Sequence, residues 1–403
     1  MIISFFCDTN PFCESSAIAN RYVGLLKGLS LNGAIINLYI LNGYDTMNNS
    51  GILSDELNFD NIRAEYCPYN KRKHKSKIGL VKEALFGVHL TFKQEKWVYN
   101  KFKVDADCLW LAGGPAFRRL FIKYRNHISC LTFVEFSEFQ QLYKQEKNYY
   151  IKQWQYWREY KVTCDLIKRV DCIAVMTKVL EDYYKKIAGS NTKFLHLPMT
   201  VDISRFAKKQ LTIPDYKQPY IAFTGTYTDA KDGVSILIKS FAKIANKYPD
   251  YSLYLAGFKH PNMNDQIRLI DELKLRGRCS HIGMLDKTVI PAFIENANLL
   301  VLSRPDSRQA QGGFPTKLGE YLATGNPVCV TKVGEIPDYL EDNVSAFMAE
   351  PGNVDSFADA MDRALSNPEN AKRVGENGRV VAETSFNAVI QAKTLCDFLL
   401  RNK

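Results

Sequence analysis

Two loops of the sequence combine residue types that bind phosphate. The first, FTGTYTDAKDG (residues 223–233), ends an apolar run and carries Lys231 two positions before Gly233, where a helical pattern begins. The second, GGFPTKLGEYLATGNPVC (residues 312–329), passes through Pro315 into a short helical pattern. The free amides at the start of a helix attract anions, and a neighbouring ammonium group adds to that attraction. Each loop therefore predicts half of a phosphate-binding site.

The second loop also supplies a carboxylate, Glu320. We expect Thr316 to cap the helix, which should run to Thr324 before Gly325-Asn326-Pro327 ends it. The stripe that faces the core should consist of Leu318, Tyr321 and Leu322. Glu320 then projects about 150° away from the centre of that stripe. Water would solvate it in an isolated helix, but beside a phosphate site it is placed to accept hydrogen bonds from ribose hydroxyls.

Short apolar runs alternate with amphipathic segments along the chain, as in an α/β protein. The runs that we expect to form strands are Ile2–Phe6, Ile35–Leu41, Cys108–Ala112, Cys130–Phe136, Cys172–Met176, Phe194–Leu197, Tyr220–Thr224, Ser252–Gly257, Leu299–Leu302 and Val328–Thr331. Fully apolar strands of this kind predict parallel sheets covered by helices on both faces. Ligands of such sheets bind beyond the carboxyl ends of the strands, which is where both loops stand.

The strands fall into two series, which predicts two doubly wound domains. The segment between them, Pro198–Pro219, contains turn residues and has no clear period, so it is the expected linker. We expect a first domain over residues 1–200 and a second over residues 201–385, with a C-terminal helix over residues 386–403 that packs back on the first. A cleft between two such domains is the default ligand site.

Composition is that of an ordinary globular protein of 403 residues, long enough for two cores. Its ten cysteines form no CxxC pair, and several lie inside apolar runs, which favours a reducing compartment. The start of the chain, MIISFFCDTN, lacks the basic and long apolar regions of a secretion signal, and no apolar run is long enough to span a bilayer. We therefore expect a cytoplasmic location.

Positive charge is concentrated in the first half of the chain. Residues 1–200 hold 28 Lys and Arg against 19 Asp and Glu, which accounts for nine of the ten net positive charges. Basic residues alternate with aromatic ones around Lys71–Lys77 and in Tyr143–Lys161. Such runs are often only solvated, but they also suit an anionic membrane surface. No RNA- or DNA-binding motif accompanies them, so nucleic acid is not an expected partner.

Three further stretches extend the pattern of the two loops. They are PMTVDISRF at the linker, HIGMLDKTVIPAFIENANLLVLSRPD, and VCVTKVGEIPDYLEDNVSAFMAEPGN. Together with the loops they resemble the family-4 retaining glycosyltransferases of the GT-B fold, over nearly the whole chain. The resemblance implies two Rossmann-like domains that face each other across a cleft, the first for the acceptor and the second for a nucleotide sugar. It implies a hexosyltransferase that takes its sugar from a UDP- or GDP-sugar with retention, without a bound metal or other cofactor.

The resemblance also implies roles for residues. Lys231 would neutralise the leaving diphosphate, Glu320 would hold the ribose, and backbone near Gly283–Leu285 would meet the base. The amides of Gly313 and Phe314 and the helix start would contact the sugar and the diphosphate. The donor-binding set implied in this way is Gly225, Thr226, Gly283, Leu285, Gly313, Phe314, Thr316 and Lys317.

The sequence departs from the family pattern on the donor side. The family pairs two glutamates eight positions apart, but Gly312 stands eight residues before Glu320, which leaves the identity of the donor sugar open. Thr226 replaces the arginine that usually precedes Lys231 by five residues. Lys317 is the candidate to compensate for that lost cation.

Other departures lie in the first domain. The histidine that usually follows the strand around Thr132-Phe133 is missing, and LTFVEFSEF instead offers Glu135 and Glu138 to orient the acceptor or to act as a base. Ser15 and Ser16 replace a glycine pair. With Gly114, they are the expected source of backbone amides for the acceptor.

These substitutions keep two other classes of function open: a catalytically inactive scaffold that binds nucleotide sugars, and a nucleotide-sugar epimerase. Asp105-Ala-Asp107 resembles a metal-binding DxD motif but precedes a strand, so we assign it to a turn, and we interpret His127, His196 and His281 as structural. For a transferase, the expected acceptor is a growing cell-surface polysaccharide or a polyprenyl-linked saccharide. The basic first domain would then make a peripheral contact with the inner face of the membrane.

Overall fold

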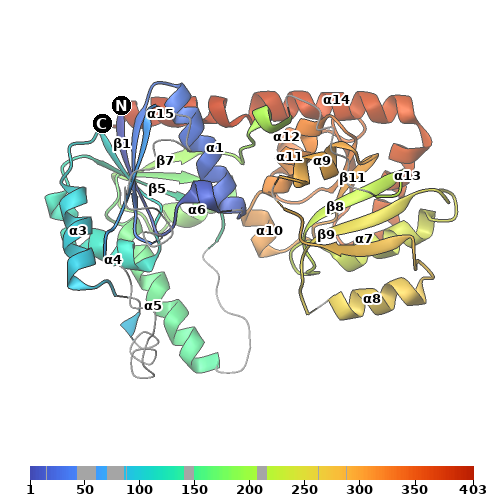
Figure 1. The fold of residues 1–403 in the computed structure, drawn as a ribbon, viewed down its shortest axis with the longest axis horizontal. Coiled ribbons are helices and arrows are strands. Elements are labelled where there is room, and N and C mark those ends of the chain that lie inside the picture. The colour runs from blue at the N-terminus through green and yellow to red at the C-terminus, as the bar shows by residue number, and fades with distance from the viewer. Residues whose placement is uncertain are drawn as a thin grey trace. The chain divides into compact units, whose positions relative to one another are not determined.

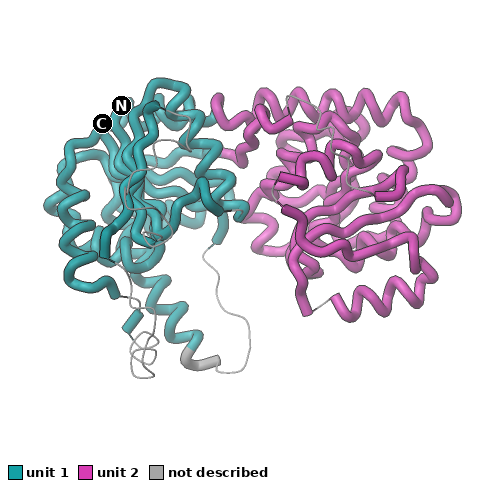
Figure 2. The backbone as a smooth tube through the Cα atoms, viewed as in Figure 1, with its two compact units in different colours: residues 1–197, 391–403 teal, residues 198–390 magenta. Residues whose placement is uncertain are grey.

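A computed structural model describes residues 1–14, 16–42, 60–69, 86–87, 89–139, 149–206, 216–261, 263–286 and 288–403, and the structural statements below concern these residues. The chain forms two compact units (Figure 2). Unit 1 consists of residues 1–197 and 391–403, and unit 2 of residues 198–390. The sequence analysis placed the first boundary at residue 200 and the return to the first domain at residue 386.

Unit 1 contains a seven-stranded parallel sheet in the order β3-β2-β1-β4-β5-β6-β7 (Figure 1). Its strands are β1 (Ile2–Cys7), β2 (Ile35–Ile40), β3 (Ile62–Tyr66), β4 (Cys108–Leu111), β5 (Leu131–Phe136), β6 (Cys172–Val175) and β7 (Lys193–His196). Its helices are α1 (Ala17–Leu31), α3 (Phe92–Phe102), α4 (Pro115–Tyr124), α5 (Tyr149–Ile167), α6 (Lys178–Lys185) and α15 (Ala388–Arg401), of which the last belongs to unit 1 from Gln391 onward.

Helices cover both faces of this sheet because successive strand residues point in opposite directions. On β1, the ring of Phe5 packs against Tyr22 of α1, whereas the ring of the next residue, Phe6, packs against Phe102 of α3 and Phe117 of α4. The face of Phe5 is closed further by α15, whose buried Ala392, Leu395, Phe398 and Leu399 join the same hydrophobic cluster. The C-terminal segment thus completes the core of unit 1.

Unit 2 contains a six-stranded parallel sheet in the order β10-β9-β8-β11-β12-β13. Its strands are β8 (Tyr220–Thr226), β9 (Ser252–Phe258), β10 (Cys279–Gly283), β11 (Leu299–Leu302), β12 (Val328–Thr331) and β13 (Phe347–Ala349). Its helices are α7 (Val234–Ile244), α8 (Met263–Glu272), α9 (Ile290–Glu295), α10 (Arg308–Gly312), α11 (Thr316–Thr324), α12 (Ile336–Tyr339), α13 (Val354–Ser366) and α14 (Pro368–Ser385). A short 3-10 helix, η4 (Ile203–Phe206), precedes the sheet.

The predicted strands are all present, and both sheets are parallel as expected. The prediction was wrong by omission at β3, β10 and β13, each of which forms the edge of a sheet. Edge strands pair on one side only, so they need no continuous apolar run, and β3 alternates buried and more exposed residues. The strand order reverses between β1 and β4 and between β8 and β11, so the loops at the carboxyl ends separate there and leave room for a ligand.

Candidate functional site

The loop after β8 is held by an internal hydrogen bond, at the point where the strand order of the second sheet reverses. Asp232 is buried, and its Oδ2 accepts a hydrogen bond from the Thr226 amide at 3.1 Å. Gly233, the residue before α7, has a φ of +65°, and a Cβ there would stand 2.1 Å from the carbonyl oxygen of Ser303, which follows β11. Only glycine fits that position. Lys231 and Asp232 are therefore held at the carboxyl end of β8, next to β11.

Helix α11 is also attached at the carboxyl end of β8. Leu318, Tyr321 and Leu322 are buried as predicted, and the Tyr321 hydroxyl accepts a hydrogen bond from the Thr224 amide at 2.7 Å. The prediction that Thr316 caps this helix was wrong. Thr316 is the first helical residue, and Pro315 before it makes no capping hydrogen bond with its side chain. The start of α11 thus keeps free backbone amides at the carboxyl end of β8.

Lys317 lies in the first turn of α11 and points at the loop after β8. Its Nζ donates to Asp232 Oδ1 at 2.7 Å, and the two side chains are only 18% and 3% exposed. Gly225 leaves room for this side chain, because a Cβ at that position would stand 2.2 Å from Nζ and 2.7 Å from Phe223 Cζ. The ammonium group also lies 4.8 Å from the centre of the Phe223 ring. Lys317 is thus fixed in place at the end of β8.

Further cations lie within electrostatic reach of Lys317. Burial lowers the pKa of Lys317, Asp232 counteracts that shift, and the positive charges of Arg304 and Lys231 lower the pKa further. Two further basic side chains thus act on the ammonium group that is paired with the buried Asp232. Such an excess of positive charge is suited to a phosphate or diphosphate group.

Glu320 follows Lys317 by three residues, so the two side chains belong to neighbouring turns of α11. Its Oε1 accepts a hydrogen bond from Arg205 Nη1 of η4 at 2.5 Å, and the two side chains are 29% (Arg205) and 19% (Glu320) exposed. The predicted ribose carboxylate is therefore not simply solvated. Within unit 2, Lys317 and Glu320 thus share α11, and Lys231 lies within electrostatic reach of Lys317.

The other residues that were predicted to bind the donor lie elsewhere in unit 2. Gly283 ends β10 with a φ of +79°, and its amide donates to the Tyr227 hydroxyl at 3.1 Å. β10 is two strands from β8, about 10 Å away. Gly313 has an extended backbone, and Phe314 is buried against Tyr339 and Phe386, so its ring is part of the core. Any contact of Phe314 with a ligand is left to its backbone.

In unit 1 the predicted acceptor residues gather where the sheet order reverses between β1 and β4. The Gly114 amide precedes α4 and donates to Asp8 Oδ2 at 2.6 Å. Ser16 caps α1, and its hydroxyl accepts a hydrogen bond from the Ala19 amide at 3.2 Å. Ser15 lies outside the described residues. The amide of Gly114 and the hydroxyl of Ser16 therefore already have partners within unit 1.

The two candidate carboxylates at the end of β5 differ in environment. Glu135 forms an ion pair with Arg21, and the two side chains are 2% and 1% exposed. Arg21 also donates to the Leu197 carbonyl at 3.0 Å. Glu138 is exposed. Because Glu135 is buried and neutralised by Arg21, Glu138 is the one that faces solvent, as a group that orients an acceptor must.

Comparison with known proteins agrees with this geometry. Residues 204–381, nearly all of unit 2, match the family model of the glycosyl transferases group 1. The chain carries a glycosyl transferases group 1 domain. The alpha-D-kanosaminyltransferase of Streptomyces kanamyceticus is 27% identical to it over 170 residues, which cover 42% of each chain. The chain matches about half of the length of its first curated relatives, between 40% and 56%.

Solved structures extend the likeness to both units. Sucrose-phosphate synthase from Thermosynechococcus elongatus superimposes over the full length of both chains with a TM-score of 0.69 and 16% identity. HepE of Anabaena, solved in complex with UDP and glucose, does so with a TM-score of 0.69 and 14% identity. Both units therefore have the Rossmann-like architecture of GT-B structures.

Three charged residues near the predicted site residues of the two units were not identified from the sequence. Asp232, Arg205 and Arg21 each form an ion pair with a residue that is far away in the sequence. A signal existed for Arg21, since it shares one face of α1 with the buried Leu25 and Leu29, where a charge needs a partner. Arg205 lies in the short 3-10 helix η4 and Asp232 in a polar loop, and neither place gives such a signal.

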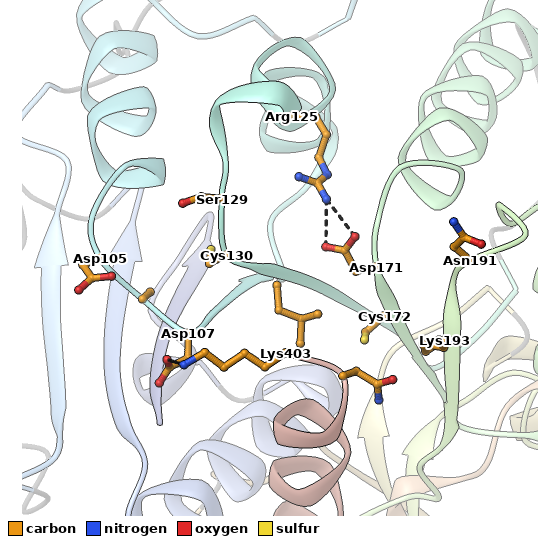
Figure 3. Close-up of a pocket in the computed structure, with 13 residues that line it drawn as sticks. Asp105, Asp107, Arg125, Ser129, Cys130, Asp171, Cys172, Asn191, Lys193 and Lys403 are labelled. Atoms are coloured by element: carbon orange, nitrogen blue, oxygen red, sulfur yellow. Dashed lines mark hydrogen bonds and ion pairs between the residues drawn. The ribbon is translucent and has the colours of Figure 1, made fainter.

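The DxD-like residues lie at the amino ends of the strands of the unit 1 sheet, opposite to the carboxyl ends where ligands are expected. Asp105 and Asp107 line a hollow of about 610 Å³ at the amino ends of β4 to β7 (Figure 3). Asp107 accepts a hydrogen bond from the Ile2 amide at 2.7 Å and pairs with Lys403. Within the described part of the chain, no three His, Cys, Asp or Glu side chains are placed to hold a metal ion. Asp107 therefore joins the end of the chain to the sheet.

The predicted structural histidines include one inside the group 1 domain. His281 lies on β10, where its Nε2 is 3.0 Å from Gln266 Oε1. Burial lowers the pKa of His281 to about 4, so the ring is neutral at physiological pH. It acts there as a partly buried, hydrogen-bonded structural residue.

Proposed function

We propose that the protein is a retaining hexosyltransferase that uses a UDP- or GDP-sugar. The observation that carries this proposal is the pair of Lys231 and Lys317 at the strand-order reversal of the group 1 domain, with Glu320 on the same helix as Lys317. The names of its relatives support the reaction class, and the complexes of HepE with UDP and with UDP-glucose support a nucleotide-sugar donor. The start of α11, which has no side-chain cap, adds a further anion-binding feature.

On the donor side, each group has a distinct role in this proposal. Lys231 and Lys317 neutralise the diphosphate, with Asp232 holding Lys317 in place. Glu320 accepts hydrogen bonds from the ribose hydroxyls, and the backbone of Gly283–Leu285 meets the base. Because the two lysines supply the positive charge that a divalent cation would otherwise bring, the reaction needs neither a metal nor another cofactor.

The reaction itself exchanges one bond of the anomeric carbon for another. The bond from this carbon to the β-phosphate oxygen breaks, and negative charge collects on the diphosphate beside Lys231 and Lys317. The acceptor oxygen forms its bond from the same face, which retains the configuration, and its proton passes to an oxygen of the released diphosphate. Glu138 is the carboxylate that orients the acceptor. Glu135, paired with Arg21, keeps that end of the sheet rigid.

A binding and turnover assay tests this function. Melting temperature is measured with UDP, GDP and a panel of their sugars, since a ligand that binds only the folded state raises it. The matching nucleotide sugar should then release UDP or GDP slowly in water, at a rate that EDTA leaves unchanged. Conversion into another sugar nucleotide would indicate an epimerase, and binding without turnover would indicate a scaffold. Loss of turnover in EDTA would contradict a metal-free reaction.

We further propose that the acceptor is a growing cell-surface polysaccharide or a polyprenyl-linked saccharide, which unit 1 meets at an anionic membrane surface. Trp154 and Trp157 of α5 are 48% and 45% exposed and lie ring to ring at 5.1 Å, and Lys161 Nζ stands 4.0 Å from the centre of the Trp157 ring. Tryptophan and lysine together suit the boundary between headgroups and acyl chains. The predicted basic run Lys71–Lys77 lies outside the described residues.

The two tryptophans lie on the side of α5 that is opposite to its contact with α4. Arg119 of α4 pairs with Glu159 at 2.5 Å, and Arg118 donates to the Thr163 hydroxyl at 2.8 Å, so these residues fasten α5 to α4. In Figure 1, α5 extends away from the sheet of unit 1. No helix within the described ranges is both long enough and apolar enough to cross a bilayer. A surface contact through α5 is the mode that this arrangement offers.

Vesicle flotation tests the membrane contact. The protein should float with vesicles that contain anionic lipid at low salt, and high salt should release it, because salt screens the charges of the lysines. Replacing both Trp154 and Trp157 by alanine should remove most of the bound fraction. Phe258→Ala, which removes an exposed aromatic side chain of unit 2, is the matched control and should bind normally. Wild-type protein that stays entirely in the soluble fraction at low salt would overturn the proposal.

A further inference from the structure

The outer side of α11 is lined by the segment that connects the two units. A Cβ at Gly319 would stand 2.7 Å from Met199 Cε and 3.2 Å from Val201 Cβ, so this segment lies directly against the helix. Its backbone is held in turn by the chain after α14: the Val201 amide donates to the Phe386 carbonyl at 2.8 Å, and the Ala388 amide donates to the Val201 carbonyl at 3.0 Å. The segment is therefore part of the fixed structure around α11.

Arg205 extends from this segment to Glu320. It lies in η4, whose 3-10 turn is closed by a bond from the Arg205 amide to the Asp202 carbonyl at 3.3 Å. Its guanidinium also stands 5.7 Å from the centre of the Phe206 ring, and Phe206 is buried. Arg205 thus starts from an anchored position, and its Nη1 meets only one of the two carboxylate oxygens of Glu320 in the hydrogen bond described above.

We infer that Arg205 is a positioning residue that orients the Glu320 carboxylate toward the ribose of the nucleotide. This inference rests on the proposed role of Glu320. A free glutamate side chain samples many rotamers, and binding a ribose hydroxyl would require it to give up that freedom. Arg205 imposes the order during folding, while Oε2 of Glu320 keeps its lone pairs for a hydroxyl donor. The segment that joins the two units thereby reaches into the nucleotide site.

Pairing with Arg205 also places a positive charge next to the Glu320 carboxylate, which the negative charges of a bound diphosphate would otherwise repel. The guanidinium offsets that repulsion without competing for the ribose, because the carboxylate accepts at both oxygens. Arg205 therefore acts through Glu320, and we expect its removal to be felt chiefly by ligands that carry ribose hydroxyls.

Nucleotide affinity with and without the ribose hydroxyls tests this inference. The probes are UDP or GDP, whichever the wild type binds more tightly, and the 2′,3′-dideoxy form of the same nucleotide. Arg205→Gln should raise the Kd of the normal nucleotide about tenfold, the loss expected for one well-oriented hydrogen bond to a charged group, and change the Kd of the dideoxy form less than about twofold. Arg205→Lys, which keeps a cation, should fall between the wild type and Arg205→Gln.

Two controls separate positioning from a structural or general electrostatic effect. In a Glu320→Gln background, Arg205→Gln should add no further loss of affinity. Arg276→Gln, which breaks an exposed arginine–carboxylate pair with Asp271 elsewhere in unit 2, should leave both Kd values unchanged. An equal loss for both nucleotides, or no loss for either, would overturn the inference while leaving the proposed function intact. A wild type that binds neither UDP nor GDP would instead remove the proposed function itself.

Discussion

Lys231→Ala is expected to lower kcat for sugar transfer by a factor of about 10² to 10³. In the proposed reaction, the ammonium group after β8 acts where negative charge develops as the diphosphate leaves, and that charge is larger in the transition state than in the bound donor. The Kd of the donor should change much less than kcat. The measurement is turnover of the nucleotide sugar at saturating concentration.

Lys239→Ala is the matched control for this prediction. Lys239 is an exposed lysine on α7, the helix that follows Lys231. Its removal takes away one positive charge from the same unit, so it should leave kcat within twofold of the wild type. If Lys231→Ala loses less than about threefold in kcat, Lys231 has no part in stabilising the leaving group.

Lys317→Met should impair both folding and turnover, because it leaves Asp232 buried without its partner. Loss of one member of a buried ion pair typically costs about 3 to 5 kcal/mol in the free energy of unfolding. It also places an uncompensated negative charge where the diphosphate must bind. We expect a fall in kcat of about 10² or more in whatever fraction of the protein folds.

The double variant Asp232→Asn/Lys317→Met separates the two effects. Replacing the carboxylate by an amide removes the buried charge, so stability in denaturant should recover to within about 1 to 2 kcal/mol of the wild type. Turnover should stay low, because the double variant still lacks the Lys317 cation, which we expect to compensate for the arginine that Thr226 replaces. A double variant with normal turnover would make Lys317 a purely structural residue.

Local features of the sequence determined most of the fold. The apolar runs that became central strands were recognisable because a strand covered on both faces has no polar position. The edge strands β3, β10 and β13 were not, since their composition overlaps with that of loops. The start of α11 was recognisable from Pro315, and its end from Gly325, which has a φ of +77°. The cap at Thr316 was misassigned by one position, as is common at helix ends.

The candidate site shows the same difference between local features, which the sequence reveals, and contacts between distant residues, which it does not. Lys231 and Glu320 were named from the sequence because they belong to two short loop-to-helix stretches, and Lys317 was named through the resemblance to the family motif in the second stretch. The ion pairs that hold these residues were not found. Lys317 meets Asp232 across 85 residues, and Glu320 meets Arg205 across 115. Glu135, chosen for its place at the end of β5, is neutralised by Arg21, which is 114 residues away.

The sequence by itself thus determined an α/β protein with two parallel sheets and two loops suited to a diphosphate, since periodicity and helix starts depend only on neighbouring residues. The tertiary structure decided which strands form the edges, which carboxylates stay accessible and which cations they meet. Those outcomes depend on strand order and on the burial of distant charges, and buried charges must find partners wherever the fold places them.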